Sequence, residues 1–214
     1  MDEQDAIDGE RGSALCRVAL EEALRAARGM VSDLLWATIL GNPTLADGEP
    51  LFCASRGNVG TGAFSDENLR TAWGTIASQT DRADDGSPIH LNLQPRYLIT
   101  SPQGLIRARE FIRPQVVEGS EILPRSESRL SRTGFVDPVS GELLATPNDG
   151  AWLLGAPAEQ RTSIALLLLR GETEPTVRQT PLRQGQWGMS FDIQFAAAAA
   201  ALDGKGLFYS SADG

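Results

Sequence analysis

The sequence is poor in the side chains that most often carry enzyme chemistry. Its 214 residues include one histidine, His90, one lysine, Lys205, and two cysteines, Cys16 and Cys53. A structural zinc site takes four ligands, and the histidine and the cysteines cannot supply them without carboxylates. No Gly-x-Ser-x-Gly motif accompanies His90, so a serine hydrolase has no support. We expect no metal and no cofactor.

Two short segments match ligand-binding motifs only in part. Residues 57–62 are glycine-rich, but they lack the Lys-Ser/Thr of a P-loop and do not follow a clear strand. Residues 81–92 carry Asp, Asp and Gly at the first, fifth and sixth places of a calcium loop, but Ala and Asn fail at the third and twelfth. We interpret the first segment as a flexible hinge and do not expect calcium at the second.

Long hydrophobic runs are also absent. The aliphatic run at residues 164–169 is far too short to span a bilayer. The first ten residues carry five acids and no apolar run, so we see no signal peptide. Two cysteines without metal-like spacing suit a reducing cytosol. These features predict a soluble, intracellular chain with no membrane partner.

The charge balance limits the partners. The net charge is -9, which argues against a nucleic-acid reader held by phosphate contacts but allows a protein that encloses nucleic acid. Eighteen of the nineteen basic residues are arginine, the better interface cation. A GC-rich genome explains this bias more simply than selection for interfaces.

One stretch organises the rest of the chain. Residues 65–82 predict an amphipathic helix, because Ser65 suits the N-cap and two acids follow it in the first turn. Leu69, Trp73, Ile76 and Thr80 form one apolar stripe. The turn signal at 84–88 ends this helix.

The N-terminal part predicts an arm and a loop. Residues 1–12 are acidic and are expected to be disordered or a loose arm, whereas 13–40 have a helical pattern. Residues 41–64 are rich in glycine and proline and predict a long loop. Leu51 and Phe52 make an apolar patch in this loop, which either contacts a neighbouring subunit or tucks into its own.

The remainder predicts strands around a second helix, and the fold class is α+β with a mostly antiparallel sheet. The pattern indicates that 113–150 are irregular, with regularly spaced Arg125, Arg129 and Arg132. The alanines at 196–201 favour a helix by propensity but also allow continuation of the preceding strand. The expected elements are strands at 90–93 and 97–99, a helix from 101–102 to 112, buried strands at 152–154 and 164–169, a half-buried strand at 187–195, and a last strand at 207–209.

This order of elements resembles the major capsid proteins of tailed phages with the Hong Kong 97-type fold. More narrowly it resembles the Mu-like major head subunit, including versions fused behind a ClpP-like prohead protease. The resemblance covers roughly residues 14 to 212, and its order of motifs is more specific than any one of them. The matching stretches are 40–43, 47–52, 56–58, 69–79, 94–100, 152–154 and 203–207.

The resemblance implies a domain plan and a function. It implies an N-terminal arm with a helix at 1–40, an extended loop at 41–64 lying on a neighbour, a peripheral domain at 65–89 and 187–214 with a spine helix at 65–82, and an axial domain at 90–186. Such proteins have no active site. Their copies close as pentamers and hexamers into an icosahedral shell, the virion capsid, around packaged double-stranded DNA, and they are assembled in the host cytoplasm.

The same resemblance names candidate partners and residues. The partners are other copies of the chain, a scaffold, a prohead protease, portal and decoration proteins, and DNA enclosed without sequence-specific binding. Lys205 lies far from the extended loop, so we expect no isopeptide crosslink of the kind that some relatives form there. The subunit-interface candidates are Leu51, Phe52, Arg56, Arg125, Arg129 and Arg132, and the spine-helix core is Leu69, Trp73 and Ile76.

Three other functions compete with a capsid protein. An encapsulin-like shell would share the fold but enclose an enzyme cargo. A small enzyme would use His90 with an acid such as Asp84 or Asp85. A phage adaptor or decoration protein would bind a shell without forming one.

Overall fold

The structure is a computed structural model that describes residues 3–112, 122–130, 135–136, 143–144, 150–169, 174–180 and 190–211. Within these ranges it contains three α-helices and thirteen strands, so the α+β class is confirmed. The chain divides into two compact units. Unit 1 comprises Met1–Leu35 and Leu166–Ala199, and unit 2 comprises Trp36–Ala165 and Ala200–Gly214.

The first helix, α1 (Glu3–Leu40), is longer than the sequence predicted. It already begins at Glu3, so the expectation of a loose arm over 1–12 was wrong for residues 3–12. This segment has no proline, and acidic side chains near a helix N-terminus interact favourably with the helix dipole. Gly29 does not interrupt the helix, although glycine costs about 1 kcal/mol relative to alanine.

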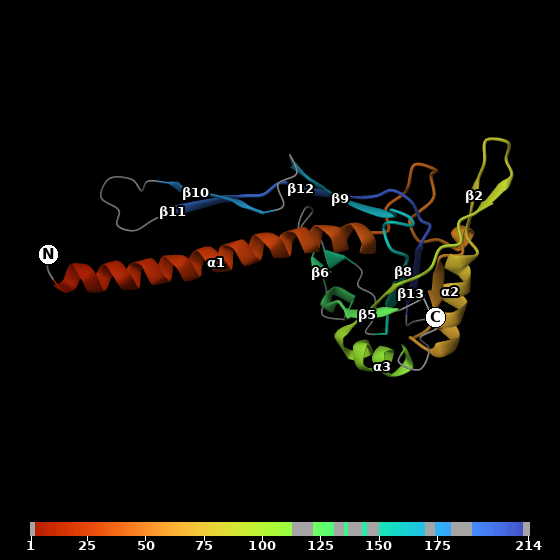
Figure 1. The fold of residues 1–214 in the computed structure, drawn as a ribbon, viewed down its shortest axis with the longest axis horizontal. Coiled ribbons are helices and arrows are strands. Elements are labelled where there is room, and N and C mark those ends of the chain that lie inside the picture. Colours follow the sequence, from red (N-terminus) through yellow and green to blue (C-terminus); the bar gives the residue numbers. More distant parts are fainter. Residues whose placement is uncertain are drawn as a thin grey trace. The chain divides into compact units, whose positions relative to one another are not determined.

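A two-stranded ribbon accompanies α1 in unit 1, as Figure 1 shows. Strand β10 (Thr176–Thr180) pairs antiparallel with β11 (Ser190–Gln194). From Phe191 to Ala199 the side chains alternate strictly between half-buried and exposed, which confirms the predicted alternation as far as the chain is described. Trp187 and Met189 lie outside the described residues.

The ribbon continues through β9 (Ile164–Leu168) and β12 (Ala197–Ala201), which settles the open question of the alanine run in favour of a strand. The prediction of a buried strand at 164–169 was wrong in one respect. The strand is present, but Leu167 and Leu169 are each 59% exposed. Among the described strands β9 pairs only with β12, so these leucines project from a narrow two-stranded ribbon.

Unit 2 is built on a five-stranded sheet with the order β1-β13-β8-β4-β5. The three central strands are antiparallel, whereas each edge strand is parallel to its neighbour. The main sheet is therefore mixed rather than mostly antiparallel, while the described hairpins are antiparallel. The bounds are β1 Val59–Thr61, β13 Leu207–Ser211, β8 Trp152–Gly155, β4 Tyr97–Thr100 and β5 Leu123–Ser126.

Helix α2 (Asp66–Ala77) begins as the sequence predicts and ends earlier. The Ser65 hydroxyl accepts a hydrogen bond from the Asn68 amide at 3.2 Å, so Ser65 is the N-cap. The helix stops at Ala77 instead of Arg82, and Thr80 belongs to strand β2 (Thr80–Arg82). The turn signal at 84–88 closes the hairpin of β2 with β3 (Pro88–His90), so pairing across a turn replaced continuation of the helix.

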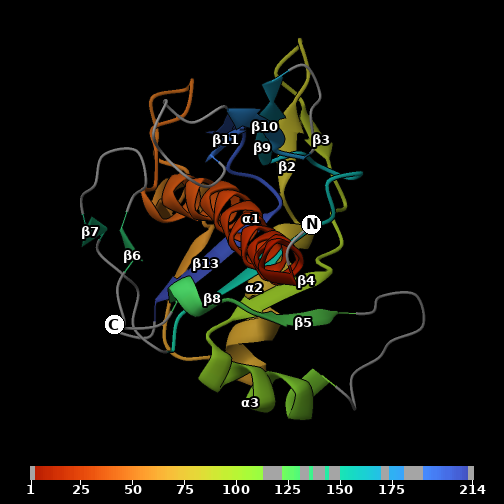
Figure 2. The ribbon, with the colours of Figure 1, turned by 90° about the vertical axis from the view of Figure 1, so that its left-hand side faces the viewer.

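Helix α3 (Pro102–Ile112) confirms its prediction, with Ser101 accepting a hydrogen bond from the Gly104 amide at 3.3 Å. It packs against β4 and β5, as Figure 2 shows. The expectation of irregular structure over 113–150 was wrong where β5 and the short strands β6 and β7 form. The expected strand at 90–93 is confined to its first residue, His90 in β3. The remaining short elements are η1 Ala54–Arg56, η3 Ser128–Leu130, β6 Phe135–Val136 and β7 Leu143–Leu144.

The core of unit 2 surrounds Trp152 on the central strand. Trp152 is 0% exposed, and its ring centroid lies 5.7 Å from Phe64 and 5.8 Å from Phe208. The indole nitrogen donates to the Gly62 carbonyl at 3.3 Å, so the one polar atom of this side chain is satisfied. The predicted helix-core residues Leu69 and Ile76 join this cluster, and Trp73 packs against it half-buried.

Replacing Ser65 by alanine tests the assignment of the N-cap. Ser65→Ala removes the acceptor for the Asn68 amide and should lower the free energy of unfolding by about 1 kcal/mol. Urea unfolding followed by circular dichroism measures this loss. Ser78→Ala, at the other end of α2, is the matched control, because its hydroxyl only donates to the Thr75 carbonyl of the same helix. Equal losses in the two variants would contradict the cap.

Candidate functional site

The loop at 41–64 is fastened by two asparagine side chains. Asn42 clamps Phe52: its amide nitrogen donates to the Phe52 carbonyl at 3.0 Å, and its side-chain oxygen accepts from the Phe52 amide at 2.7 Å. Asn58 is 0% exposed and donates to the carbonyls of Leu51 at 2.7 Å and Gly204 at 2.9 Å. Its oxygen accepts from the Cys53 amide at 3.0 Å. The predicted hinge is therefore a hydrogen-bonded corner.

The apolar patch of this loop tucks into its own subunit. Leu51 is 0% exposed and Phe52 is 7% exposed. The Phe52 ring lies 5.4 Å from the ring of Tyr209 on β13, and burial raises the pKa of Tyr209 to about 12. Of the two alternatives for Leu51 and Phe52, the structure therefore shows packing within their own subunit rather than exposure to a neighbouring one.

Arg56, another interface candidate, pairs inside the loop. Its guanidinium donates to both carboxylate oxygens of Asp47, at 2.6 Å and 2.5 Å, and to the Pro50 carbonyl at 3.1 Å. The hydrogen bond from Arg56 is the main reason that the pKa of Asp47 lies below its usual value. A Cβ on Gly204 would lie only 2.6 Å from the Arg56 side chain, so the close approach of the 203–204 turn requires glycine.

Four charged residues form an ionic network in unit 2. Asp81 of β2 accepts from Lys205 at 2.9 Å and lies 3.2 Å from Arg161. Arg161 also pairs with Asp203, which accepts from the Lys205 amide at 3.1 Å. Two acids and two cations therefore join the root of the β2–β3 hairpin to the turn before β13. We call Asp81, Arg161, Asp203 and Lys205 the ionic network.

The ionic network should make the free energy of unfolding depend on pH in the acidic range. Lys205 is the main cause of the lowered pKa of Asp81, whose ordinary value is 3.8. A carboxyl group with a lowered pKa stabilises the fold above its unfolded pKa and loses that contribution as the pH falls through the folded value. The wild-type chain should therefore lose stability below about pH 4, and Asp81→Asn should lose less over the same window.

Urea midpoints at pH 7 and at about pH 3 measure the difference. Asp84→Asn is the matched control, because no hydrogen bond or ion pair to Asp84 is found among the described residues. Parallel acid profiles of wild type and Asp81→Asn would contradict the role of the network.

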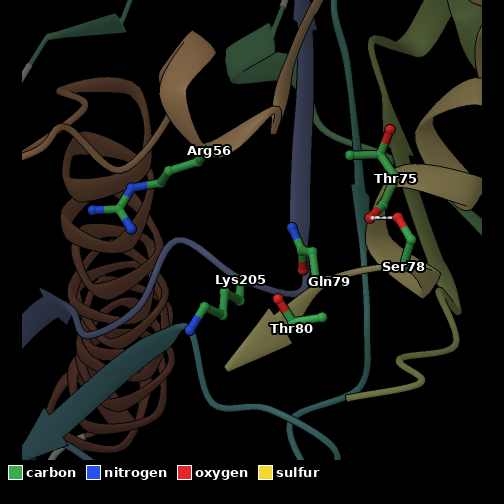
Figure 3. A pocket seen from close by; sticks show the side chains of 6 residues that line it. All are labelled: Arg56, Thr75, Ser78, Gln79, Thr80 and Lys205. Atoms are coloured by element: carbon green, nitrogen blue, oxygen red, sulfur yellow. Dashed lines mark hydrogen bonds between the residues drawn. The ribbon is translucent and has the colours of Figure 1, made fainter. Parts of the chain in front are cut away.

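A pocket of about 340 Å³ lies beside Lys205 of this network. Figure 3 shows the six side chains that line it. Its cations already have partners, Asp47 for Arg56 and Asp81 for Lys205. The Gln79 oxygen accepts from the Gly206 amide at 2.7 Å, and the Ser78 hydroxyl donates to the Thr75 carbonyl at 3.1 Å. Among the described residues, the hydrogen bonds of this lining place no nucleophile beside a base. The lining residues are Arg56, Thr75, Ser78, Gln79, Thr80 and Lys205.

The residues of the competing enzyme hypothesis are not brought together. His90 is exposed and lies opposite Thr80 in the β2–β3 hairpin. Asp85 accepts from the Ser87 amide and hydroxyl, at 2.9 Å and 2.6 Å. In the described ranges no hydrogen bond or ion pair joins His90 to Asp84 or Asp85. The described residues also contain no group of three potential metal ligands and no helix long and apolar enough to cross a membrane.

The arginine candidates differ in their surroundings. Arg125 is exposed on the edge strand β5. Arg129 is half-buried and pairs with Glu127 at 2.8 Å. Arg132 lies outside the described residues.

Trp73 of the predicted helix core has a buried indole nitrogen, and no hydrogen-bond partner for it is found among the described residues.

A comparison with protein families decides among the hypotheses. The model of a phage capsid protein family matches residues 5–210, which is nearly the whole chain. This chain is a member of the phage capsid protein family. No match was found among curated proteins.

Membership in the capsid family gives the chain its function class. It is a structural protein of the phage head, a virion component, and not an enzyme. Capsid proteins self-assemble, so the functional surfaces of this one are the surfaces that meet other copies. The 41–64 loop, the ionic network and the core around Trp152 are then the parts that stabilise unit 2 of each subunit.

Sequence reasoning missed most of the residues that fix this capsid subunit. The sequence placed Asn58 in a glycine-rich hinge and in the matching stretch 56–58 without giving its side chain a role, and it did not connect Asp203 with Arg161. An asparagine between a glycine and a short strand was the one available signal, since Asn often hydrogen-bonds backbone groups nearby. The partners of Arg161 lie far away in sequence, so no local pattern indicates them.

Proposed function

We propose that this capsid protein forms an icosahedral head shell of the Hong Kong 97 type, in which pentamers and hexamers enclose double-stranded DNA. The observation that carries the proposal is the match of the capsid family to residues 5–210. A mixed α+β chain with a long helix, a ribbon and a separate five-stranded unit supports it. The stretches 40–43, 47–52 and 94–100, which prompted the resemblance, further support the Mu-like subgroup.

The two units suggest a revised domain plan for the shell subunit. The resemblance gave the spine helix to 65–82, but α2 has 12 residues and spans about 18 Å, whereas α1 has 38 residues and spans about 57 Å. We propose α1 as the spine, with unit 1 as the peripheral domain and unit 2 as the axial domain. This plan differs from the one that the resemblance implied. There the peripheral domain comprised 65–89 and 187–214, and the axial domain comprised 90–186.

The charge of the chain fits a container for DNA. With a net charge of -9, the subunit does not gain from many phosphate contacts, and packaged DNA is held without sequence-specific binding. Other copies of the chain are the main partners. Arg125 and Arg129 remain interface candidates, and a scaffold, a prohead protease, a portal and decoration proteins complete the proposed set.

No isopeptide bond should join the subunits of the shell. Lys205 is the only lysine, and although Gly204 beside it contacts the 41–64 loop through Asn58, its ammonium group is engaged by Asp81 at 2.9 Å. In mature particles boiled in detergent, this chain should therefore run as a monomer near 22.9 kDa on a denaturing gel. A ladder of covalent multimers that persists under reducing conditions would contradict this prediction.

The contents and symmetry of purified particles test the proposed function. We expect cryo-electron microscopy to show five-fold and six-fold rings, and nuclease-protected DNA to be extracted from filled particles. Particles that contain an enzyme cargo and no DNA would favour the encapsulin-like alternative. A chain that only decorates a shell formed by another protein would favour the adaptor alternative.

A further inference from the structure

One face of the ribbon in unit 1 is apolar and uncovered. Leu167 and Leu169 of this face are each 59% exposed, and Ala196 and Ala198 beside them are exposed as well. The Leu169 amide donates to the Ala196 carbonyl at 3.1 Å, which fixes the leucines next to the alanines. Neither 163–169 nor 196–202 contains a charged residue. We call Leu167, Leu169, Ala196 and Ala198 the leucine face.

The same ribbon is polar further along the same face. Alternation from residue 191 onward puts Asp192 and Gln194 on the side of Ala196 and Ala198. Asp192 lies opposite Arg178, a pairing of opposite charges across the strands. One end of the face is therefore solvated by charged and polar groups, and only the other end lacks them.

An uncovered apolar ribbon is unusual in a protein that stays soluble. In the described residues β9 and β12 pair only with each other, so both ribbon edges are open. Natural proteins protect open edges with charges, proline or a covering element, because such edges pair with other chains. The leucine face has none of these charges. Its small alanines also allow another surface to approach closely.

The described residues of unit 1 include no buried hydrophobic side chain. Every buried hydrophobic side chain of the described core lies in unit 2. The inner stripe of α1, which includes Leu20, Leu24 and Val31, is only half-buried. Ordering a residue costs about 1–2 kcal/mol of backbone entropy, and a two-stranded ribbon is at best marginally stable in water. A further surface is needed to complete this unit.

The chain itself carries a surface of matching chemistry and length. Ala19, Ala23, Ala26 and Met30 are exposed on α1 and form one stripe at i, i+4, i+7 and i+11. This alanine stripe spans about 17 Å along the helix axis. The uncharged ribbon segment 163–169 spans about 20 Å. Protruding leucines on one surface and small side chains on the other are complementary in shape.

We propose that the leucine face of one copy packs against the alanine stripe of α1 in a second copy. The proposal rests on the self-assembly that the proposed function requires. The contact is heterologous, because two different patches meet, and such contacts close into rings when the rotation permits. It buries the exposed leucines and adds apolar packing to the described part of unit 1.

Photo-crosslinking between isotopically labelled copies tests the contact. A benzoylphenylalanine is placed at position 167, and heavy and light chains are co-assembled into particles before irradiation. The expected product is a heavy–light peptide pair that joins position 167 to the α1 segment 18–30. The same probe at position 194, on the polar end of the face, should give less of this product. Pairs confined to one copy, or pairs with any other segment, would overturn the proposal.

A charge test of the leucine face gives an independent readout. Leu167→Asp with Leu169→Asp should reduce the assembled fraction by about tenfold or more, because two apolar contacts are replaced by buried charges. Gln194→Asp, on the polar end opposite the uncharged Thr176, is the control for an added charge and should assemble normally. Normal assembly of the leucine double variant would overturn the proposal while leaving the capsid function intact. Failure of the wild-type chain to assemble would instead contradict the proposed function.

Discussion

Trp152→Ala lowers the free energy of unfolding by about 3–5 kcal/mol, the largest loss that we expect from a single substitution. The side chain is 0% exposed on the central strand, and its ring packs between Phe64 and Phe208. Removing it leaves a cavity lined by side chains of α2 and β13 that cannot collapse fully. The free energy of unfolding of a domain is typically only about 5–15 kcal/mol. A large fraction of the Trp152→Ala molecules should therefore be unfolded at about 37 °C.

Urea unfolding by circular dichroism measures this loss, and a milder variant keeps the prediction testable if Trp152→Ala is insoluble. Trp152→Phe keeps most of the apolar volume but loses the hydrogen bond from the indole nitrogen to the Gly62 carbonyl. It should cost clearly less than the alanine variant. A loss below about 1 kcal/mol in Trp152→Ala would show that this residue is not the centre of the core.

Asn58→Ala should cost about 3 kcal/mol, the second-largest effect. The side chain makes three hydrogen bonds to backbone groups, to the buried carbonyls of Leu51 and Gly204 and from the half-buried amide of Cys53. The alanine variant leaves these groups unsatisfied, and each unsatisfied buried group costs about 1–3 kcal/mol. The two carbonyls lie on distant segments, so the loss should detach the loop from the turn before β13.

Limited trypsin digestion is the local readout for this variant. Cleavage after Arg56 should be faster in Asn58→Ala than in wild type, because the bond lies beside the released corner. Asn68→Ala is the matched control, since that amide makes one exposed hydrogen bond, to the Ala63 carbonyl at 2.9 Å. Equal stability and equal cleavage in the two asparagine variants would contradict the role given to Asn58.

Features fixed by neighbouring residues could be predicted from the sequence. Ser65 was identified as a cap because a hydroxyl before two acids and an apolar stripe has a local reason to be there. The start of α3 at Pro102 and the continuous apolar run of β8 follow the same logic. These elements depend on residues within one or two helical turns, or on burial of both faces of a strand.

Features fixed by distant residues could not be predicted. Thr80 continued the helical stripe in sequence, yet pairing with His90 placed it in a strand. Alanine favours helices, yet Ala197–Ala201 pairs with β9. The run 164–169 looked like a buried strand because its composition is aliphatic, and composition does not say whether the covering layer belongs to the same chain.

The same distinction between neighbouring and distant residues applies to the candidate site. The resemblance to capsid proteins rested on the order of elements and identified the family that residues 5–210 match. The interface candidates were chosen by residue type, and side-chain type does not reveal which groups already have partners. Arg56 is already paired with Asp47, and Leu51 and Phe52 are both buried. In contrast, the exposed Leu167 and Leu169 were predicted to lie in the core.

The most direct test of the central claim is negative-stain electron microscopy of the chain expressed together with its neighbouring phage genes. The void fraction from size-exclusion chromatography is the sample. We expect closed shells or rings of capsid subunits, because a member of this family forms the head by contact between its own copies. A chain that stays a monomer beside these gene products would contradict the claim that it forms a shell.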